Sequence, residues 1–242
     1  MSEALTIEQD GRLLRITFNR TTDCGVSDSM AAALAAAVSK AHETSDAVLL
    51  RSAGADFCTG RVRDAANPPA TEAYARRPEY NAVFDSYKAL RSAQVPVVGV
   101  VRGRAMGYGI AIAGLCDVCF ASDGATFNIP EIGHNVMPTM VMSALYDRVN
   151  RNALLWLAYS TDFIDALRAR ELGIVSEVVS EADLDEAVDR FCRTLLGRPR
   201  PALLGLKEYL RVAPRMDEQG AIDYARSLHS MVNTAAAMKR AH

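Results

Sequence analysis

The stretch of residues 94–131 constrains the fold of this chain more than any other. It begins with an apolar, mostly β-branched run at residues 95–101, which predicts a buried strand. A glycine-containing turn follows at residues 103–109. The uncharged segment 110–115 behind the turn has the composition of a buried helix. The sequence therefore predicts a strand, a glycine turn and a buried helix in direct succession.

This order of elements has a chemical consequence. The first N–H groups of a helix have no acceptor within the helix, and they lie at the positive end of its dipole. They can therefore face a ligand above the turn. A second strand is expected at residues 117–121, and Glu131 follows it shortly afterwards. Donors for a developing negative charge and one candidate base thus belong to a single supersecondary unit.

Around this stretch, apolar runs alternate with segments of helical spacing. Residues 54–61 form a second glycine-containing loop after a strand. Residues 63–78 contain three prolines and mixed charges, so we expect a mobile loop or partial helix of the kind that covers a site. Further strands are expected at residues 13–18, 47–50 and 174–179, and helices at residues 27–41, 79–91, 139–145, 153–159, 165–172 and 181–196.

Particular residues mark where helices begin and end. Ser27 or Asp28 is expected to cap the first helix, and Thr139 the helix that starts there. The chain after Pro201 is expected to be helical, with an interruption near Pro214. The sequence is therefore mixed in its first part and helical in its last.

The composition is that of a soluble globular protein. The chain has 242 residues, half of them hydrophobic, and a net charge of −2. Its length fits one domain with a terminal extension, and its charge argues against a nucleic-acid surface. We find no secretory signal at Met1 and no apolar run that could span a bilayer. Five cysteines in such a chain favour a reducing, cytoplasmic location.

Cys116 and Cys119 form a CxxC pair, which could be half of a zinc site or a redox pair. A strand would direct these residues to opposite faces. The sequence has no second CxxC, and its four histidines are scattered. A structural role is therefore favoured, and no metal is expected.

Other glycine-loop sites fit the sequence poorly. Gly107 and Gly109 match the first two glycines of a dinucleotide-binding turn, but Ile112 stands at the third position. An acidic residue at the end of a second strand is also missing. Neither a P-loop nor the GxSxG motif of serine hydrolases occurs.

Several motifs, in matching order, resemble the crotonase superfamily of enoyl-CoA hydratases and isomerases. The start at Phe18-Asn19-Arg20 also resembles the family's opening, with Thr21 in place of its proline, and residues 169–179 and Lys207 resemble later parts. The main motifs are Phe57-Cys58-Thr59-Gly60-Arg61, the run of residues 96–109, Leu115-Cys116-Asp117 and Phe127-Asn128-Ile129-Pro130-Glu131.

This resemblance implies an α/β fold. Residues 1–197 would form a spiral of repeated ββα units that binds acyl-CoA, and residues 198–242 a C-terminal helical oligomerisation or lid region. A homotrimer or homohexamer is implied. Because coenzyme A is part of the substrate, no separate cofactor is implied, and neither a nucleic acid nor a membrane is an expected partner.

The resemblance also assigns an oxyanion hole for the thioester oxygen. Its donors would be the backbone N–H groups of Arg61 and Tyr108, beside Gly107. The family usually has small residues at both donor positions, but the donors belong to the backbone. The loop that receives the CoA adenine would fall on Arg61, Val62 and Arg63, with Val62 where the family has an acidic residue.

The carboxylates discriminate between reactions. Family hydratases use two glutamates, and Glu131 matches the second, whereas Ala111 stands at the position of the first. With a single carboxylate, the chain resembles the isomerases of the family, in which one glutamate moves a proton between two carbons. Hydration, hydrolysis or carbon–carbon cleavage with another second group, and acyl-CoA binding without catalysis, remain the alternatives.

The remaining candidates surround this carboxylate. His134 is either a substrate contact, a second acid or a structural histidine. Thr139 belongs to the expected pocket wall at residues 136–144. Glu72 and Glu79 could each supply a second carboxylate. The phenol of Tyr108 is expected to pack in the core.

Overall fold

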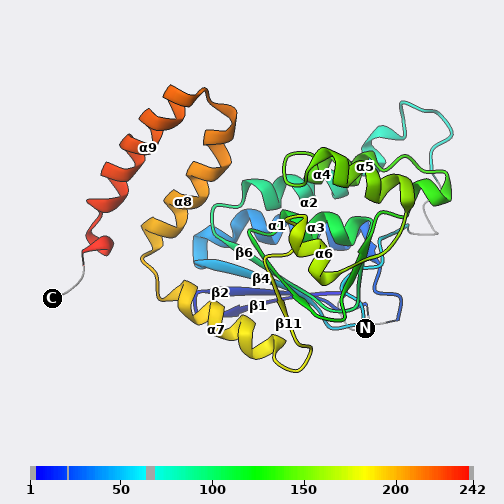
Figure 1. Ribbon diagram of the computed structural model, residues 1–242, viewed down its shortest axis with the longest axis horizontal. Helices are drawn as coiled ribbons and strands as arrows, with labels where there is room; N and C mark the ends of the chain where they lie inside the picture. Colours follow the sequence, from blue (N-terminus) through cyan, green and yellow to red (C-terminus); the bar gives the residue numbers. More distant parts are fainter. Residues whose placement is uncertain (1–3, 21, 64–68, 240–242) are drawn as a thin grey trace.

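A computed structural model describes residues 4–20, 22–63 and 69–239. Within these ranges, six strands form one sheet (Figure 1). The first two strands pair antiparallel and the others pair parallel, as β-branched runs between helices predict. In sheet order the strands are β1 (Leu5–Asp10), β2 (Leu13–Phe18), β4 (Ala47–Ser52), β6 (Val97–Val101), β8 (Val118–Ser122) and β11 (Glu177–Val179).

Short strands outside this sheet shape the loops. β7 (Arg104–Met106) pairs in parallel with β9 (Thr126–Asn128), which pairs antiparallel with β10 (Ile164–Asp165). β3 (Val26–Ser27) pairs in parallel with β5 (Arg61–Val62). β7 lies inside the segment expected to be only a glycine turn. That expectation was wrong because the strand exists through its pairing with residues about twenty positions away.

Helices cover both faces of the large sheet. α1 (Asp28–Thr44), α2 (Asn81–Ser92) and α3 (Tyr108–Leu115) lie on one face, and α7 (Leu184–Leu196) lies on the other (Figure 1). Successive residues of a strand point to opposite faces, so the strands contribute to two hydrophobic cores. Leu50 packs in the core beneath α1 to α3, and its neighbour Leu49 packs in the core beneath α7.

The order of the elements repeats along the described chain. A strand of the large sheet, a short strand and a helix follow one another in β2–β3–α1, β4–β5–α2, β6–β7–α3 and β8–β9–α4 (Thr139–Leu145). The expected mixture of strands and helices is thus confirmed, while the spiral arrangement stays a prediction. α5 (Arg151–Ser160) and α6 (Ala166–Glu171) follow before the sheet ends with β11. None of the helices within the described residues has the length and apolar character needed to cross a bilayer.

The predicted helix caps had different outcomes. The Ser27 hydroxyl accepts a hydrogen bond from the Met30 N–H at 3.3 Å, which confirms Ser27 as the cap of α1. Thr139 does not cap α4. Thr139 is the first residue within the helix, so Pro138 occupies the cap position, and no side chain caps this end.

The segment at residues 63–78 lies partly outside the described residues, which omit 64–68. Its described part consists of turns that lead into a 3₁₀ helix (Arg77–Tyr80) and then into α2. Thr21, which stands in place of the family's proline, lies outside the described residues as well.

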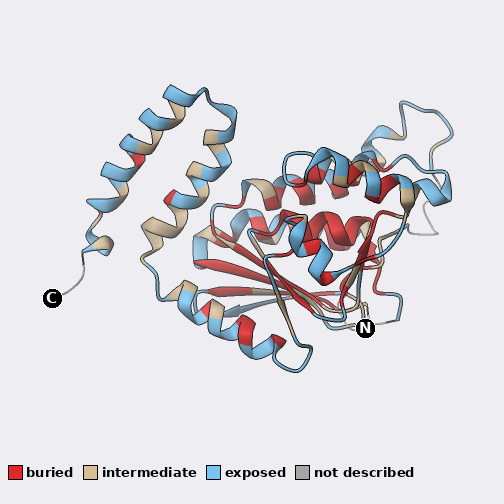
Figure 2. Ribbon diagram, in the orientation of Figure 1, coloured by how far each residue is buried: buried red, intermediate tan, exposed pale blue. Residues whose placement is uncertain are grey.

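α8 (Arg200–Val212) and α9 (Glu218–Asn233) form a hairpin that projects from the rest of the molecule and is largely exposed (Figures 1 and 2). The predicted break near Pro214 is confirmed by a 3₁₀ turn between the two helices. Ion pairs attach α8 to the sheet. Asp46, which is only 2% exposed, pairs with Arg12 and Arg200.

The contact between α3 and the loop after β4 generates a stability prediction. A Cβ atom added at Gly109 would lie 2.4 Å from the backbone carbonyl oxygen of Cys58. Gly109→Ala is therefore expected to lower the free energy of unfolding by about 1 to 3 kcal/mol, because backbone must move. Urea unfolding measures the change. Gly124→Ala is the matched control, since a Cβ there meets nothing within 4 Å; equal effects of the two substitutions would contradict the prediction.

Candidate active site

A parallel bridge between Cys58 and Ala105 brings the two glycine loops together. The Cys58 N–H donates to the Arg104 carbonyl at 3.1 Å, and the Met106 N–H donates to the Cys58 carbonyl at 2.8 Å. Beyond this bridge, Arg61 is the third residue after Cys58, and Tyr108 is the third after Ala105. The structure therefore places the two predicted donor residues past the same end of one bridge.

The backbone N–H groups of both residues are available. The Val26 N–H donates to the Gly60 carbonyl at 2.9 Å, a pattern in which the Arg61 N–H points away from β3. The Tyr108 N–H belongs to the first residue of α3, where no intrahelical acceptor exists. Within the described part of the chain, neither N–H donates a hydrogen bond outside its own helix or strand pairing.

The Arg61 side chain is held elsewhere. Its guanidinium donates to the Asp28 carboxylate at 2.6 and 2.7 Å and to the Glu79 carbonyl at 2.8 Å. It also lies over the Tyr80 ring, 5.5 Å from the ring centroid. The hydrogen bonds to Asp28 are the main reason that the pKa of Arg61 is raised. A large residue is thus accommodated at a donor position because its side chain is bound to α1 and to the 3₁₀ helix that precedes α2.

The Tyr108 side chain packs in the core, as expected. Its ring is buried and stacks on Tyr87 with centroids 5.5 Å apart and an interplanar angle of 19°. Its hydroxyl lies 2.8 Å from the Ser86 hydroxyl. Tyr108 therefore faces the candidate site through its backbone.

Glu131 lies directly against the glycine turn. It begins a 3₁₀ helix (Glu131–His134) after β9. A Cβ atom added at Gly107, whose φ is +52°, would lie only 2.7 Å from Glu131 Oε1. The positive φ favours glycine at position 107, and a side chain there would displace the Glu131 carboxylate. This contact places the carboxylate beside the residue that precedes the Tyr108 N–H.

The environment of Glu131 favours a general base. Its Oε2 atom is buried, and no described residue donates a hydrogen bond to it. Burial raises the pKa of Glu131 above its ordinary value, although a backbone hydrogen bond and His134 partly oppose the shift. A carboxylate with a raised pKa accepts a proton more readily.

The other predicted residues have more peripheral positions. His134 and Thr139 are exposed, on the 3₁₀ helix that Glu131 begins and at the start of α4 respectively. Arg63 is also exposed, while Val62 is partly buried and packs against Gly25. Their proposed contacts with substrate stay predictions.

The two candidate second carboxylates are engaged with local backbone. Glu72 accepts from the Ala75 N–H at 2.9 Å, and Glu79 accepts from the Ala70 N–H at 2.6 Å. Ala111 is fully buried in α3. Among the described residues, neither carboxylate forms a hydrogen bond with the buried Oε2 atom of Glu131.

Tyr87 is a neighbour of the site that sequence reasoning missed. Its helical spacing with Val83 and Leu90 predicts a core residue, and its ring is indeed buried. However, its hydroxyl has no hydrogen-bond partner within the described residues, and Glu131 is one of the charges that act on it. Helical spacing alone does not separate an aromatic residue that fills a core from one that borders a site.

The cysteines are buried thiols. Burial raises the pKa of Cys58 and of Cys116 to about 12, so both remain protonated. The Cys116 thiol contacts the Ile112 carbonyl at 3.3 Å. The described residues contain no group of three or more metal-ligating side chains.

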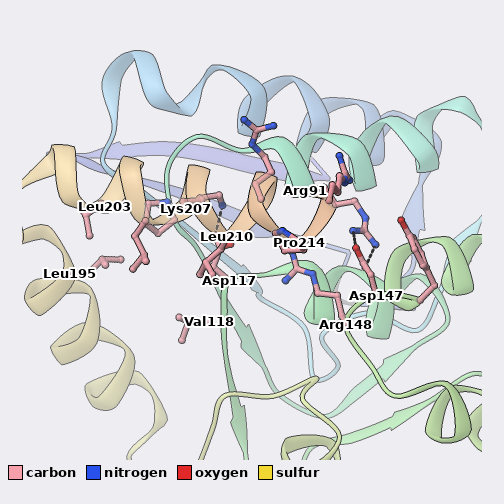
Figure 3. Close-up of a pocket in the computed structure, with 15 residues that line it drawn as sticks. Arg91, Asp117, Val118, Asp147, Arg148, Leu195, Leu203, Lys207, Leu210 and Pro214 are labelled. Atoms are coloured by element: carbon pink, nitrogen blue, oxygen red, sulfur yellow. Dashed lines mark hydrogen bonds and ion pairs between the residues drawn. The ribbon is translucent and has the colours of Figure 1, made fainter. Parts of the chain in front are cut away.

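A cavity of about 640 Å³ lies elsewhere, between α8 and the core (Figure 3). None of the predicted site residues lines it. In it Arg91 binds Asp147 at 2.8 and 2.9 Å and Lys207 pairs with Asp117, while three further arginines, Arg148, Arg211 and Arg215, also line it. Because Glu131 and the two candidate donors lie outside this cavity, we regard the turn at Gly107 as the better candidate for chemistry.

Known proteins resemble the whole chain. The family model described as enoyl-CoA hydratase/isomerase matches residues 8–241. The chain is 32% identical, over 180 residues, to a (7aS)-7a-methyl-1,5-dioxo-2,3,5,6,7,7a-hexahydro-1H-indene-carboxyl-CoA hydrolase of Mycobacterium tuberculosis, covering 73% of this chain and 71% of the relative. It is 22% identical over 195 residues to a peroxisomal dienoyl-CoA isomerase of Arabidopsis thaliana, covering 76% and 70%.

The fold has solved counterparts. The structure of an enoyl-CoA hydratase of Mycobacterium smegmatis superposes with a TM-score of 0.90 at 24% identity, covering 98% of this chain and 93% of the other. This similarity confirms the mixed α/β fold expected from the motifs.

The burial of Glu131 predicts how stability depends on pH. Because its pKa is raised in the folded state, its contribution to stability is fully present below the unfolded pKa and is lost as the pH rises through the folded pKa. Glu131→Gln removes this loss. The stability of the variant relative to wild type is expected to increase as the pH rises from about 4 to neutral. Urea unfolding at these two pH values measures the change.

The matched control is Glu72→Gln. The pKa of Glu72 is lowered, mainly by the Ala75 N–H, so its charge stabilises the fold above its ordinary pKa. Glu72→Gln should therefore lose stability relative to wild type as the pH rises from about 4 to neutral. The same stability difference at both pH values for Glu131→Gln would show that its charge is not buried.

Proposed function

The chain belongs to the enoyl-CoA hydratase/isomerase family, and we propose that it acts on an acyl-CoA thioester through an enolate, with Glu131 as the general base. One observation carries this proposal. The Glu131 carboxylate lies against Gly107, with one oxygen unpaired among the described residues, beside the free N–H of Tyr108.

The backbone donors would stabilise the enolate. The N–H groups of Arg61 and Tyr108 would hold the thioester oxygen while Glu131 removes a proton from the adjacent carbon. The electron pair of the broken C–H bond then moves through the carbonyl, and negative charge develops on the oxygen. In an enclosed site, one such donor commonly contributes about 3 to 4 kcal/mol of transition-state stabilisation.

Isomerisation needs the fewest groups. Glu131 would return its proton two carbons further along an enoyl chain, which moves the double bond and regenerates the carboxylate. The family's hydratases use a second glutamate, but this chain has Ala111 at that position, and an alanine offers no acid or base. The engagement of Glu72 and Glu79 with local backbone supports the single-carboxylate mechanism.

Hydrolysis is a second candidate. The relative from Mycobacterium tuberculosis, at 32% identity, is a carboxyl-CoA hydrolase. Hydrolysis would use the same oxyanion donors but would consume water, so its products differ from those of isomerisation in composition.

Assembly into a trimer or hexamer is part of the proposal. The α8–α9 hairpin exposes large apolar side chains, which supports contact with another copy of the chain. They include Leu206, Leu210, Ile222 and Met231. Residues 198–242 would then be the oligomerisation region, and residues 1–197 would bind the thioester.

Replacement of the base tests the mechanism. Glu131→Gln is expected to abolish proton exchange next to the thioester carbonyl, because an amide cannot accept the proton. Proton NMR in D₂O with saturated, 2-enoyl and 3-enoyl CoA thioesters would follow exchange and identify the products. Thioester binding, measured by calorimetry, should persist in the variant.

The outcomes separate the alternatives. Glu72→Gln is the control and should exchange protons as wild type does. Retained exchange in Glu131→Gln would exclude Glu131 as the base. Thioester binding by wild type with no exchange on any panel member would favour a protein that binds acyl-CoA without catalysis.

A further inference from the structure

The cavity of about 640 Å³ between α8 and the core has no part in the proposed mechanism, and its two ends differ in character. Leu195 and Leu203 lie toward one end of it, whereas Arg91 and Arg148 lie toward the other (Figure 3). α8 contributes to both ends. Leu203 and Arg211 of this helix are about 12 Å apart along its axis, from the usual rise per residue. The cavity is therefore apolar at one end and cationic at the other.

Positive charge is in surplus in this cavity. Its lining holds five cationic side chains and two carboxylates, and both carboxylates already have cationic partners. Asp147 binds Arg91, and Asp117 pairs with Lys207 while accepting a hydrogen bond from the Val97 N–H at 2.7 Å. The other three cationic side chains form no ion pair with a carboxylate of the described residues: Arg148, Arg211 and Arg215. An anion in the cavity would supply the partner that these guanidinium groups lack.

The acidic residues closest in sequence to two of these arginines are used elsewhere. Glu208, three positions before Arg211, accepts a hydrogen bond from the Tyr224 hydroxyl at 2.7 Å. Asp217, two positions after Arg215, caps α9. The chain itself therefore does not neutralise this end of the cavity with its neighbouring carboxylates.

The apolar part of the lining is aliphatic. It consists of Pro96, Val118, Leu195, Leu203, Leu206, Leu210 and Pro214. The aromatic ring of the lining belongs to Tyr146, and the Arg91 guanidinium already lies over it, 5.3 Å from its centroid. A nucleotide base usually stacks on an aromatic ring, whereas a hydrocarbon chain gains from burial against any aliphatic surface. The lining therefore favours a hydrocarbon chain over a nucleotide.

We propose that this cavity binds an aliphatic anion, which is a hydrocarbon chain that ends in a carboxylate or phosphate group. The chain lies among the leucines, and the anionic group binds the arginines. This site is separate from the candidate active site. Asp117 follows the end of α3, whereas Tyr108 begins that helix, whose length is about 12 Å. The proposal therefore does not depend on the proposed function.

Calorimetry with simple amphiphiles tests the proposal. The probes are decanoate, hexanoate, decanol and decyltrimethylammonium. The protein is expected to bind decanoate at least about tenfold more tightly than hexanoate, because a longer chain buries more methylene groups. Decanol and decyltrimethylammonium should bind more weakly than decanoate, because they bring no negative charge to the arginines. Decyl phosphate, compared with decanoate, identifies which anionic group the site prefers.

Variants locate the binding site. The double variant Arg211→Gln, Arg215→Gln is expected to bind decanoate at least about tenfold more weakly than wild type, because the headgroup loses two charged donors. Arg226→Gln is the matched control, since Arg226 is exposed on α9, pairs with Asp223 at 2.8 Å and lies outside the cavity. It should bind decanoate as wild type does. Urea unfolding of both variants checks that the fold is retained.

Three results would overturn the proposal. They are no binding of decanoate, equal binding of decanol or decyltrimethylammonium, and unchanged decanoate binding in the double variant. A second copy of the chain is the competing occupant of the cavity. Analytical ultracentrifugation with and without decanoate separates the two: unchanged assembly supports a ligand cavity, whereas dissociation by decanoate would show that another copy fills it. Each of these failures would leave the proposed function intact, because proton exchange tests that independently.

Discussion

The candidate site depends on the short parallel bridge between Cys58 and Ala105. β4 and β6 are neighbours in the large sheet and run in the same direction, so the loops that follow them leave from the same edge. The bridge holds these loops together, and Arg61 and Tyr108 each follow three residues beyond the same end of it. Two glycine loops that are separated by more than forty residues become one surface through this contact.

The carboxylate is positioned by the same pairing rules and at a cost to stability. β9 lies beside β7, with Asn128 opposite Met106, so the chain after β9 passes the turn at Gly107. There Glu131 keeps one oxygen buried and unpaired within the described structure, and Gly107 adopts a positive φ. Such features persist only where surrounding structure holds them, as the buried α3 and its sheet do here. Burial of the Glu131 carboxylate raises its pKa, which favours proton acceptance, and the same burial lowers the stability of the fold.

The sequence was most informative where structure is local or where a motif is specific. Continuous apolar runs predicted β2, β4, β6 and β8, and the hydroxyl of Ser27 marked the start of α1. The short strand β7 could not be predicted, because its pairing with β9 depends on the tertiary fold. Sequence motifs predicted Arg61, Tyr108 and Glu131 as site residues, but no sequence pattern singled out the hydroxyl of Tyr87. Its lack of a partner depends on neighbours from several elements that spacing along α2 does not reveal.

The proposed use of backbone donors would affect how mutations act on this protein. Every amino acid except proline carries the same N–H, so nearly any codon change at Arg61 or Tyr108 leaves a donor in the chain. Variation at these positions among relatives is therefore a poor indicator of lost activity. In the proposed mechanism, selection on the chemistry would instead fall on Gly107 and Glu131, where the mechanism calls for a positive φ in one case and a carboxylate in the other. Comparison of natural variants should weigh those two positions most heavily.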